Sequence, residues 1–341
     1  MDWRALGRHP QRFSTELSTE ILNNFKNYFE INDLRHLSQI DSEEHPEAAT
    51  CGALCLNACG GHCPGSLQHR AGPRTVAGMS DTRALVWFKR DLRVRDHAPL
   101  AAAQAHGDAL ALFVIEPAWL QSPECDAIHV DFALGCLAEL RDALARRGLP
   151  LLVRVGPAVQ VLAQLHGELQ FTHLLSHEET GPGWSYTRDL EVAAWCRSQN
   201  VLWQECTQTG VVRRLRSRAG WAARWQARMD APLQRMEGGF TAAAPLAQPD
   251  LPTLQNLGLA PHGKTLQAAG ETAARRTLGS FLRTRGHDYR RALSSPLSAE
   301  EGCSRLSPHL AFGTLSLRTV HQATEAAMAR TPDRAMVYAL R

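Results

Sequence analysis

From residue 79 onward, the chain alternates short apolar runs with amphipathic stretches. The apolar runs have the length of β-strands, and they cover 84–88, 109–115, 150–155, 172–176 and 201–205. Apolar residues at helical spacing fill the intervals, most clearly at 129–147 and 187–199. Strands that alternate with helices form a parallel sheet covered on both faces. The pattern therefore predicts a doubly wound α/β domain over 79–210.

Helical patterns without strands follow this domain. We expect a basic helix and a linker over 211–264, because Ala, Pro and Gly accumulate beyond residue 238. A helix with one apolar face is predicted at 270–285. We interpret 265–341 as a partial, all-helical domain, since a stretch of this length buries too little surface for an independent core.

The composition changes near residue 78. Apolar residues between 21 and 37 fit one amphipathic helix, whereas 48–78 is rich in Gly, Cys and Pro and has no periodicity. Met79 resembles the start of a new domain. We therefore interpret 1–78 as an irregular N-terminal extension.

Four cysteines of this extension lie at equal intervals, with a histidine among them: Cys51, Cys55, Cys59, His62 and Cys63. Thiolates in a cluster are able to bind zinc or an iron–sulfur cluster. The usual zinc spacing of two intervening residues is missing, and nearby Gly and Pro oppose the helix that would align the thiols. We favour a chance cluster and predict no metal site.

Composition indicates a soluble globular protein, with 44% hydrophobic and 21% charged residues. No apolar run reaches the roughly 18 residues that span a bilayer, and no secretory segment begins the chain. We expect a cytoplasmic monomer without a membrane partner. Basic residues concentrate in two windows, 213–235 and 264–291. Such windows suit phosphates or a solvated helix face, and charge alone slightly favours the solvated face.

Polar residues gather after the first predicted strand. Asp91, Asp96 and His97 form a possible acid–base group. The structural alternative is a set of ion pairs from Arg90 and Arg93 to the two aspartates. No G-x-G-x-x-G follows this strand, which disfavours an ordinary dinucleotide site. The Gly- and Pro-containing segment 177–184 after the fourth strand is either a ligand loop or a plain connection.

A second polar motif occupies 302–316. Ser304, Arg305 and Ser307 directly precede Pro308, which marks a helix start. Hydroxyls and free N–H groups at a helix start are able to cradle a phosphate, although helix capping is the commoner role.

The segments 85–100 and 302–316 together resemble the DNA photolyase/cryptochrome family. The segments 177–196 and 211–229 are most similar to its bacterial, deoxyribodipyrimidine photolyase-like members. The resemblance extends over about 80–341 and includes Gly270-Glu271, Phe281, Leu282 and Tyr289. It implies a light-driven flavoprotein with a folded FAD. Excited reduced FAD would pass an electron to a cyclobutane pyrimidine dimer in DNA, and the protein would be a carbon–carbon lyase.

The resemblance also assigns roles to residues. Tyr289 and the run Cys303, Ser304, Arg305, Leu306 and Ser307 would contact FAD, mainly its phosphates and ribose. Arg290 and Arg291 would face DNA that contains pyrimidine dimers. The crevice of the α/β domain would hold an antenna chromophore of folate or deazaflavin type. No catalytic residue is assigned.

Several positions depart from the family. Cys303 replaces the usual Thr, Leu293 stands where the family has a DNA-contacting Arg, and Trp184-Ser185 replaces the antenna-binding Asn-Glu pair of folate-type photolyases. All eight Trp lie at or before Trp225, so the family's electron-transfer tryptophans have no counterpart here. We expect a C-terminally truncated chain that binds FAD weakly or not at all. Two alternatives remain: a cryptochrome-type blue-light photoreceptor without repair activity, and an α/β small-molecule-binding module.

Overall fold

The computed structural model describes residues 83–106, 108–240 and 249–340. The predicted N-terminal extension over 1–78, its amphipathic stretch and the Cys51 cluster lie outside these residues. The description below therefore concerns the α/β region and the helices that follow it.

The strands form one parallel sheet of five, in the order β3-β2-β1-β4-β5. Their bounds are Arg83–Phe88 for β1, Asp108–Ile115 for β2, Leu151–Val155 for β3, His173–His177 for β4 and Leu202–Cys206 for β5. Each of the five lies where the apolar runs predict it. The order reverses between β1 and β4, and in open parallel sheets ligands bind beyond the carboxyl ends of the strands at such a point.

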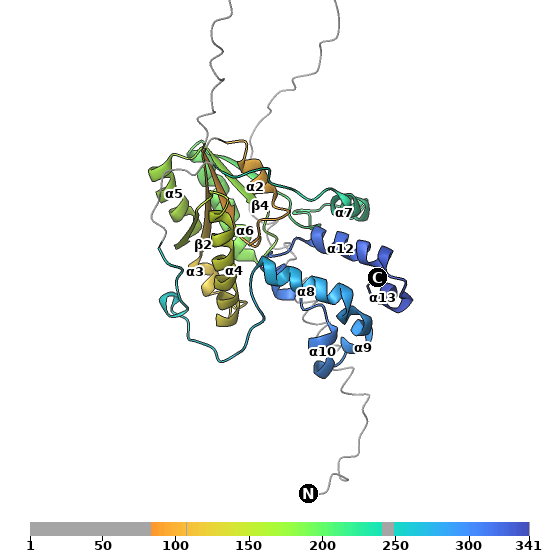
Figure 1. The fold of residues 1–341 in the computed structure, drawn as a ribbon. Coiled ribbons are helices and arrows are strands. Elements are labelled where there is room, and N and C mark those ends of the chain that lie inside the picture. The colour runs from red at the N-terminus through yellow and green to blue at the C-terminus, as the bar shows by residue number, and fades with distance from the viewer. Residues whose placement is uncertain (1–82, 107, 241–248, 341) are drawn as a thin grey trace, which may run out of the picture. The chain divides into compact units, whose positions relative to one another are not determined.

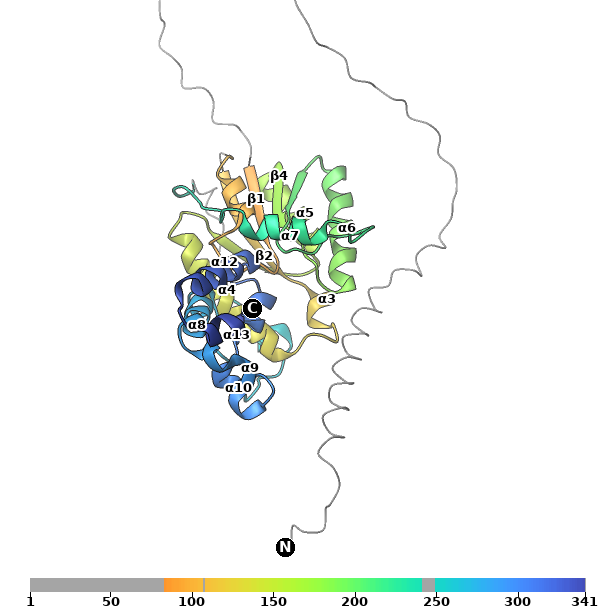
Figure 2. The same ribbon diagram turned by 90° about the vertical axis from the view of Figure 1, so that its right-hand side faces the viewer.

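Helices cover both faces of this sheet (Figure 2). Val86 and Phe88 of β1 pack with α2 (Ala98–Ala103) and α4 (Ala127–Ala145), whereas Leu85 and Trp87 pack with α5 (Ala158–Leu169) and α6 (Gly183–Ser198). Alternate residues of a strand point to opposite faces, so a strand buried on both faces is apolar throughout. The predicted α/β fold class is confirmed.

A short helix, α3 (Pro117–Leu120), lies between β2 and α4. The basic helix α7 (Trp221–Asp230) follows the sheet and precedes the helical region. Its elements are η3 (Gln255–Leu257), α8 (Glu271–Arg283), η4 (Arg285–Asp288), α9 (Tyr289–Ala292), α10 (Pro296–Gly302), α11 (Ser307–Ala311), α12 (Leu317–Arg330) and α13 (Arg334–Leu340). The helices α8 to α13 gather together (Figure 1). A small core of Ala274, Leu278, Leu306 and Leu315 packs α8 against the segments on either side of α11 and against α12.

The two polar motifs, far apart in sequence, lie in direct contact. The Leu92 N–H donates to the Phe312 carbonyl over 3.0 Å, and the Arg93 guanidinium donates to the Gly313 carbonyl over 2.9 Å. Gly313 takes a φ of +65°, and a Cβ at this position would lie 2.0 Å from the Arg90 carbonyl oxygen. The second motif therefore packs backbone to backbone against the turn that follows β1.

The expected ion pairs of this turn are wrong. Asp96 pairs with Arg318 of α12, whose Nε lies 3.1 Å from Oδ2 of Asp96. Arg90 instead approaches Glu179, and the Arg93 guanidinium donates to the backbone carbonyls of Arg95 and Asp96. Both carboxylates already have other partners, because Asp91 accepts from His97 and His177 and Asp96 pairs with Arg318.

The described helices include none that is both long and apolar enough to cross a membrane.

Candidate functional site

The loop between α10 and α11 contains the residues that the sequence assigns to the flavin. Gly302 ends α10 so close to α9 that a Cβ on it would lie 2.1 Å from the Cβ of Ala292. Arg285 of η4 donates hydrogen bonds to the backbone carbonyls of Cys303 and Ser304. The structure thus packs α9, which Tyr289 begins, against α10, the helix that precedes the 303–307 loop.

The backbone of this loop has the shape of an anion cradle. Arg305 takes a positive φ of 58°, and Leu306 is right-handed at φ −89° and ψ −9°. Alternation between left- and right-handed residues points successive N–H groups into one concavity, which binds anions. Among the hydrogen bonds between described residues, none uses the N–H of Arg305, Leu306 or Ser307 as donor.

The serines of the loop are not helix caps. Leu306 is the residue that precedes α11, and no side chain caps that helix. The hydroxyls of Ser304 and Ser307 make no hydrogen bond within the described residues. Neither hydroxyl is a buried polar atom that lacks a partner. Neither serine therefore takes the capping role weighed for this motif, and the phosphate-binding role stays a prediction.

The remaining predicted residues lie close by. Tyr289 packs edge-on against Phe281, with ring centroids 5.5 Å apart. Arg291 lines an open groove of about 630 Å³ together with Arg285 and Gly302. The guanidinium of Arg290 lies 4.0 Å from the ring centroid of Tyr338. Arg290 and Arg291 are both exposed, so phosphates are able to reach them.

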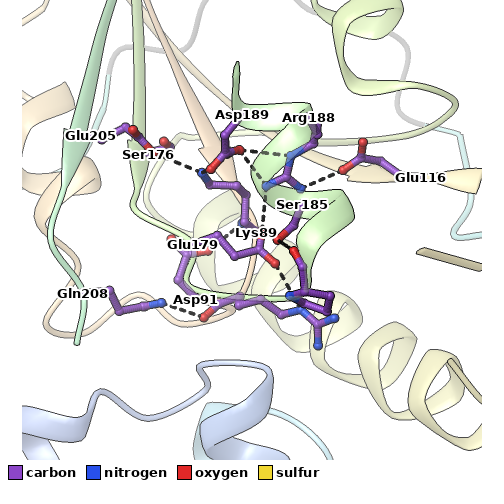
Figure 3. A network of polar contacts seen from close by, with 12 residues as sticks. Lys89, Asp91, Glu116, Ser176, Glu179, Ser185, Arg188, Asp189, Glu205 and Gln208 are labelled. Atoms are coloured by element: carbon purple, nitrogen blue, oxygen red, sulfur yellow. Dashed lines mark hydrogen bonds and ion pairs between the residues drawn. The ribbon is translucent and has the colours of Figure 1, made fainter. Parts of the chain in front are cut away.

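A buried ionic network fills the crevice at the carboxyl ends of the strands (Figure 3). Arg188 of α6 lies at its centre, with its guanidinium 2.8 Å from Glu116, 2.7 Å from Glu179 and 2.7 Å from Asp189. The acids surrounding Arg188 raise its pKa, more than offsetting the burial that alone would lower it. Burial raises the pKa of Glu116, which Arg188 partly offsets.

Lysine and arginine side chains complete the network. The Lys89 ammonium lies 3.4 Å from Asp189 and 3.5 Å from Glu205, and Arg213 binds the same two acids at 2.8 and 3.0 Å. Lys89 also lies 4.8 Å from the ring centroid of Trp87. Each buried charge therefore has an opposite partner, as a stable interior requires.

The space left in this crevice is small. The cavity between Lys89, Glu116, Trp184 and Arg188 has a volume of about 30 Å³, which holds roughly one water. Such a water is able to accept from the indole N–H of Trp184, which has no partner among the described residues. The side chains as they stand leave too little space in this cavity for an antenna chromophore.

Three further polar groups are buried where β1 and β4 end. Oδ2 of Asp91 accepts from Nε2 of His97 over 2.9 Å and from Nδ1 of His177 over 2.7 Å. Nδ1 of His97 in turn accepts from the Leu100 N–H and caps α2, which fixes its tautomer. Burial lowers the pKa of His177 to about 3, and burial also lowers that of His97. Burial alone would raise the pKa of Asp91, but the two histidines hold it well below its usual range.

The spacing of Asp91, His97 and His177 fits hydrogen bonds better than coordination of a zinc ion. Ligand atoms on a tetrahedral zinc ion are about 3.3 Å apart, longer than the two separations at Asp91. The carboxylate of Asp91 orients both histidine rings and accepts a hydrogen bond from the backbone N–H of Lys89 at 2.7 Å. Of the two roles weighed for Asp91 and His97, the structure favours the structural one, although through histidines and not through arginines.

Sequence reasoning missed most of the ionic network. Glu116, Arg188 and Glu205 were not singled out, and Lys89 and Glu179 appeared only within longer motifs. The sequence does carry a signal, because Lys89 and Glu116 directly follow buried strands and Glu205 is the penultimate residue of β5. Charges at the ends of apolar parallel strands meet at one edge of the sheet.

Comparison with known proteins identifies the family. The family profile described as DNA photolyase matches residues 84–220. A deoxyribodipyrimidine photo-lyase from a Synechococcus species is 32% identical over 267 residues, which cover 72% of this chain and 54% of that enzyme. The chain belongs to the photolyase/cryptochrome family.

Two other relatives define how much of the family the chain spans. An uncharacterised 31.6 kDa protein from another Synechococcus strain is 30% identical over 263 residues and is covered to 92% of its length. The crystal structure of a photolyase from Sulfolobus tokodaii, which contains two FAD molecules, matches with a TM-score of 0.56 at 21% identity, over 76% of this chain and 57% of that one. This photolyase/cryptochrome chain thus spans about half the length of the photolyases it matches.

Proposed function

We propose that the chain binds FAD through the 303–307 loop and serves light-driven repair of pyrimidine dimers in DNA. The observation that carries this proposal is the row of N–H groups at Arg305, Leu306 and Ser307, which have no acceptor among the described residues. They would hold the pyrophosphate, and the hydroxyls of Ser304 and Ser307 would add donors. Tyr289 would lie beside the ribose, as the family resemblance implies.

Bound FAD would supply the light-driven electron that opens the two carbon–carbon bonds of the dimer. The described residues supply the binding and the charge. Arg290 and Arg291 would contact DNA phosphates near the flavin loop. The repair activity of the relatives supports this assignment, which extends the family membership to one substrate class.

Two observations bear on the alternatives. The crevice of about 30 Å³ disfavours an α/β module that binds a small molecule at the sheet edge. A cryptochrome-type photoreceptor would share the flavin loop. A repair assay on damaged duplex DNA, with the reduced and illuminated FAD-loaded chain, separates repair from light sensing.

The flavin loop is tested by changing its backbone without its charge. Arg305→Gly keeps the left-handed conformation and loses the side chain, whereas Arg305→Val disfavours that conformation. We expect the full chain to bind FAD weakly, with ADP as a competitor. The affinity for FAD should be retained in Arg305→Gly and should fall at least about tenfold in Arg305→Val. Equilibrium dialysis measures both.

Gln170→Val is the matched control. Gln170 has a φ of 51° at the end of α5, far along the chain from the loop. This variant introduces the same backbone strain and should bind FAD as the wild type does. Equal FAD binding by Arg305→Val and the wild type would remove the loop from the proposal.

A further inference from the structure

Six arginines line one open groove between α4 and α8, which lie side by side (Figure 1). The groove has a volume of about 530 Å³, and its basic lining residues are Arg95, Arg146, Arg147, Arg275, Arg276 and Arg283. Two acids, Glu139 and Glu271, accompany them, so six positive and two negative charges give a formal charge of +4. None of the proposed flavin residues lies in this groove.

Both acids are already used as acceptors for backbone N–H groups. Oε1 of Glu139 accepts from the N–H and the hydroxyl of Thr272, at 2.9 and 2.7 Å, and so holds the start of α8. Oε2 of Glu271 accepts from the Val94 N–H at 2.8 Å. Burial raises the pKa of Glu271, which Val94 and the nearby arginines oppose. Both carboxylates are thus held in place by these contacts, and the groove keeps a net positive charge after they are counted.

The arginines themselves are accessible. Arg146, Arg276 and Arg283 are exposed, and none of the three forms an ion pair with another described residue. Arg95 is 60% exposed and lies 4.0 Å from Glu271 at its nearest approach. By contrast, Arg213 of the other basic window is bound within the ionic network.

The extent of the groove identifies its partner. Arg276 and Arg283 are seven residues apart on α8, a separation of about 10 Å along the axis. A nucleic-acid strand carries one phosphate per 3.4 Å of axis, so this length meets about three phosphates. A single small anion would need converging, enclosed guanidinium groups, which exposed arginines on separate elements do not offer.

We propose that this arginine groove, lined by Arg95, Arg146, Arg147, Arg275, Arg276 and Arg283, binds the sugar–phosphate backbone of nucleic acid as a contact surface separate from the flavin loop. Binding there depends on charge and is independent of base sequence and of a lesion. It goes beyond the proposed function, because it requires neither FAD nor light.

The test is the salt dependence of binding to an undamaged, fluorescently labelled DNA duplex, measured in the dark by anisotropy with the full chain. Each lost phosphate contact reduces the slope of log K against log salt by about 0.9. We expect Arg146→Gln/Arg276→Gln to lower the slope by about 1.8, and Arg146→Lys/Arg276→Lys to retain it. The matched control is Arg197→Gln/Arg330→Gln, which removes two exposed arginines at the ends of α6 and α12.

An unchanged slope in the glutamine variant, or an equal fall in the control, overturns the proposal. Tighter binding of poly-glutamate than of the duplex at equal charge concentration also overturns it and assigns the groove to an acidic protein. Circular dichroism and thermal melting identify a variant that has failed to fold, and the lysine variant then supplies the comparison. A chain that binds no FAD leaves this result standing, so failure of the two proposals can be told apart.

Discussion

Substitution of Gly313 tests how the flavin-loop segment is held against the α/β domain. A side chain at a positive φ costs about 1–2 kcal/mol. In addition, a Cβ on Gly313 would lie 2.0 Å from the Arg90 carbonyl oxygen and 2.6 Å from the Cα of Asp91. These are backbone atoms that no rotamer change moves, so the two segments must separate.

Separation breaks the hydrogen bond from Leu92 to Phe312 and that from Arg93 to Gly313. Each buried group left without a partner costs about 1–3 kcal/mol. Together with the backbone strain, Gly313→Ala should lower the free energy of unfolding by about 3 to 8 kcal/mol. With an m-value of about 2 kcal/mol/M in urea, the unfolding midpoint falls by at least about 1.5 M.

The matched control is Gly258→Ala. Gly258 has a φ of +74°, but a Cβ there would meet nothing within 4 Å. It carries the strain without the clash, and its cost should stay near 1–2 kcal/mol. Urea unfolding followed by circular dichroism and tryptophan fluorescence measures both variants. If Gly313→Ala costs no more than Gly258→Ala, the close backbone contact does not hold these segments together.

Two further predictions concern buried charge. Burial lowers the pKa of His309 to about 4, whereas its ordinary value is near 6.5. Between these two pH values the unfolded chain binds more protons than the folded one. The free energy of unfolding therefore falls by about 3 kcal/mol from this group as the pH drops from 6.5 to 4. His309→Gln should flatten that part of the pH dependence of unfolding, and an unchanged pH dependence would contradict the assignment. Arg188→Met leaves Glu116 and Glu179 buried without their partner and should cost about 3–5 kcal/mol in urea unfolding, whereas the exposed Arg197→Met should cost under about 0.5 kcal/mol.

The sheet was predictable because both of its faces are covered. A strand such as 84–88 is apolar at every position, and this apolar run is visible in the sequence whichever elements pack against the strand. The helix at 271–283 was equally visible from its apolar face. In contrast, the partners of Arg90, Arg93 and Asp96 depend on which distant segment packs on the turn, and local charge pairing pointed to the wrong ones.

The candidate site shows the same limit. Ser304, Arg305 and Ser307 were identifiable as polar residues at a helix start, but only backbone angles distinguish an anion cradle from a helix cap. The arginine groove was invisible as a unit, because Arg146 and Arg276 are 130 residues apart in the sequence and only tertiary packing unites them. The resemblance implies an antenna chromophore in the crevice of the α/β domain, whereas the side chains of Glu116 and Arg188 fill much of that crevice.

The contact between the turn after β1 and Gly313 has a consequence for synthesis of the chain. Arg93 and Gly313 are separated by 220 positions, and at 5–20 residues per second the ribosome needs about 10 to 40 seconds to add them. Throughout that interval Leu92 and Arg93 lack their eventual acceptors, and for its second half all five strands of the sheet have been made, since β5 ends at Cys206. The nascent chain therefore presents an unfinished turn for many seconds, and closing it is the late step that joins the two halves of the molecule.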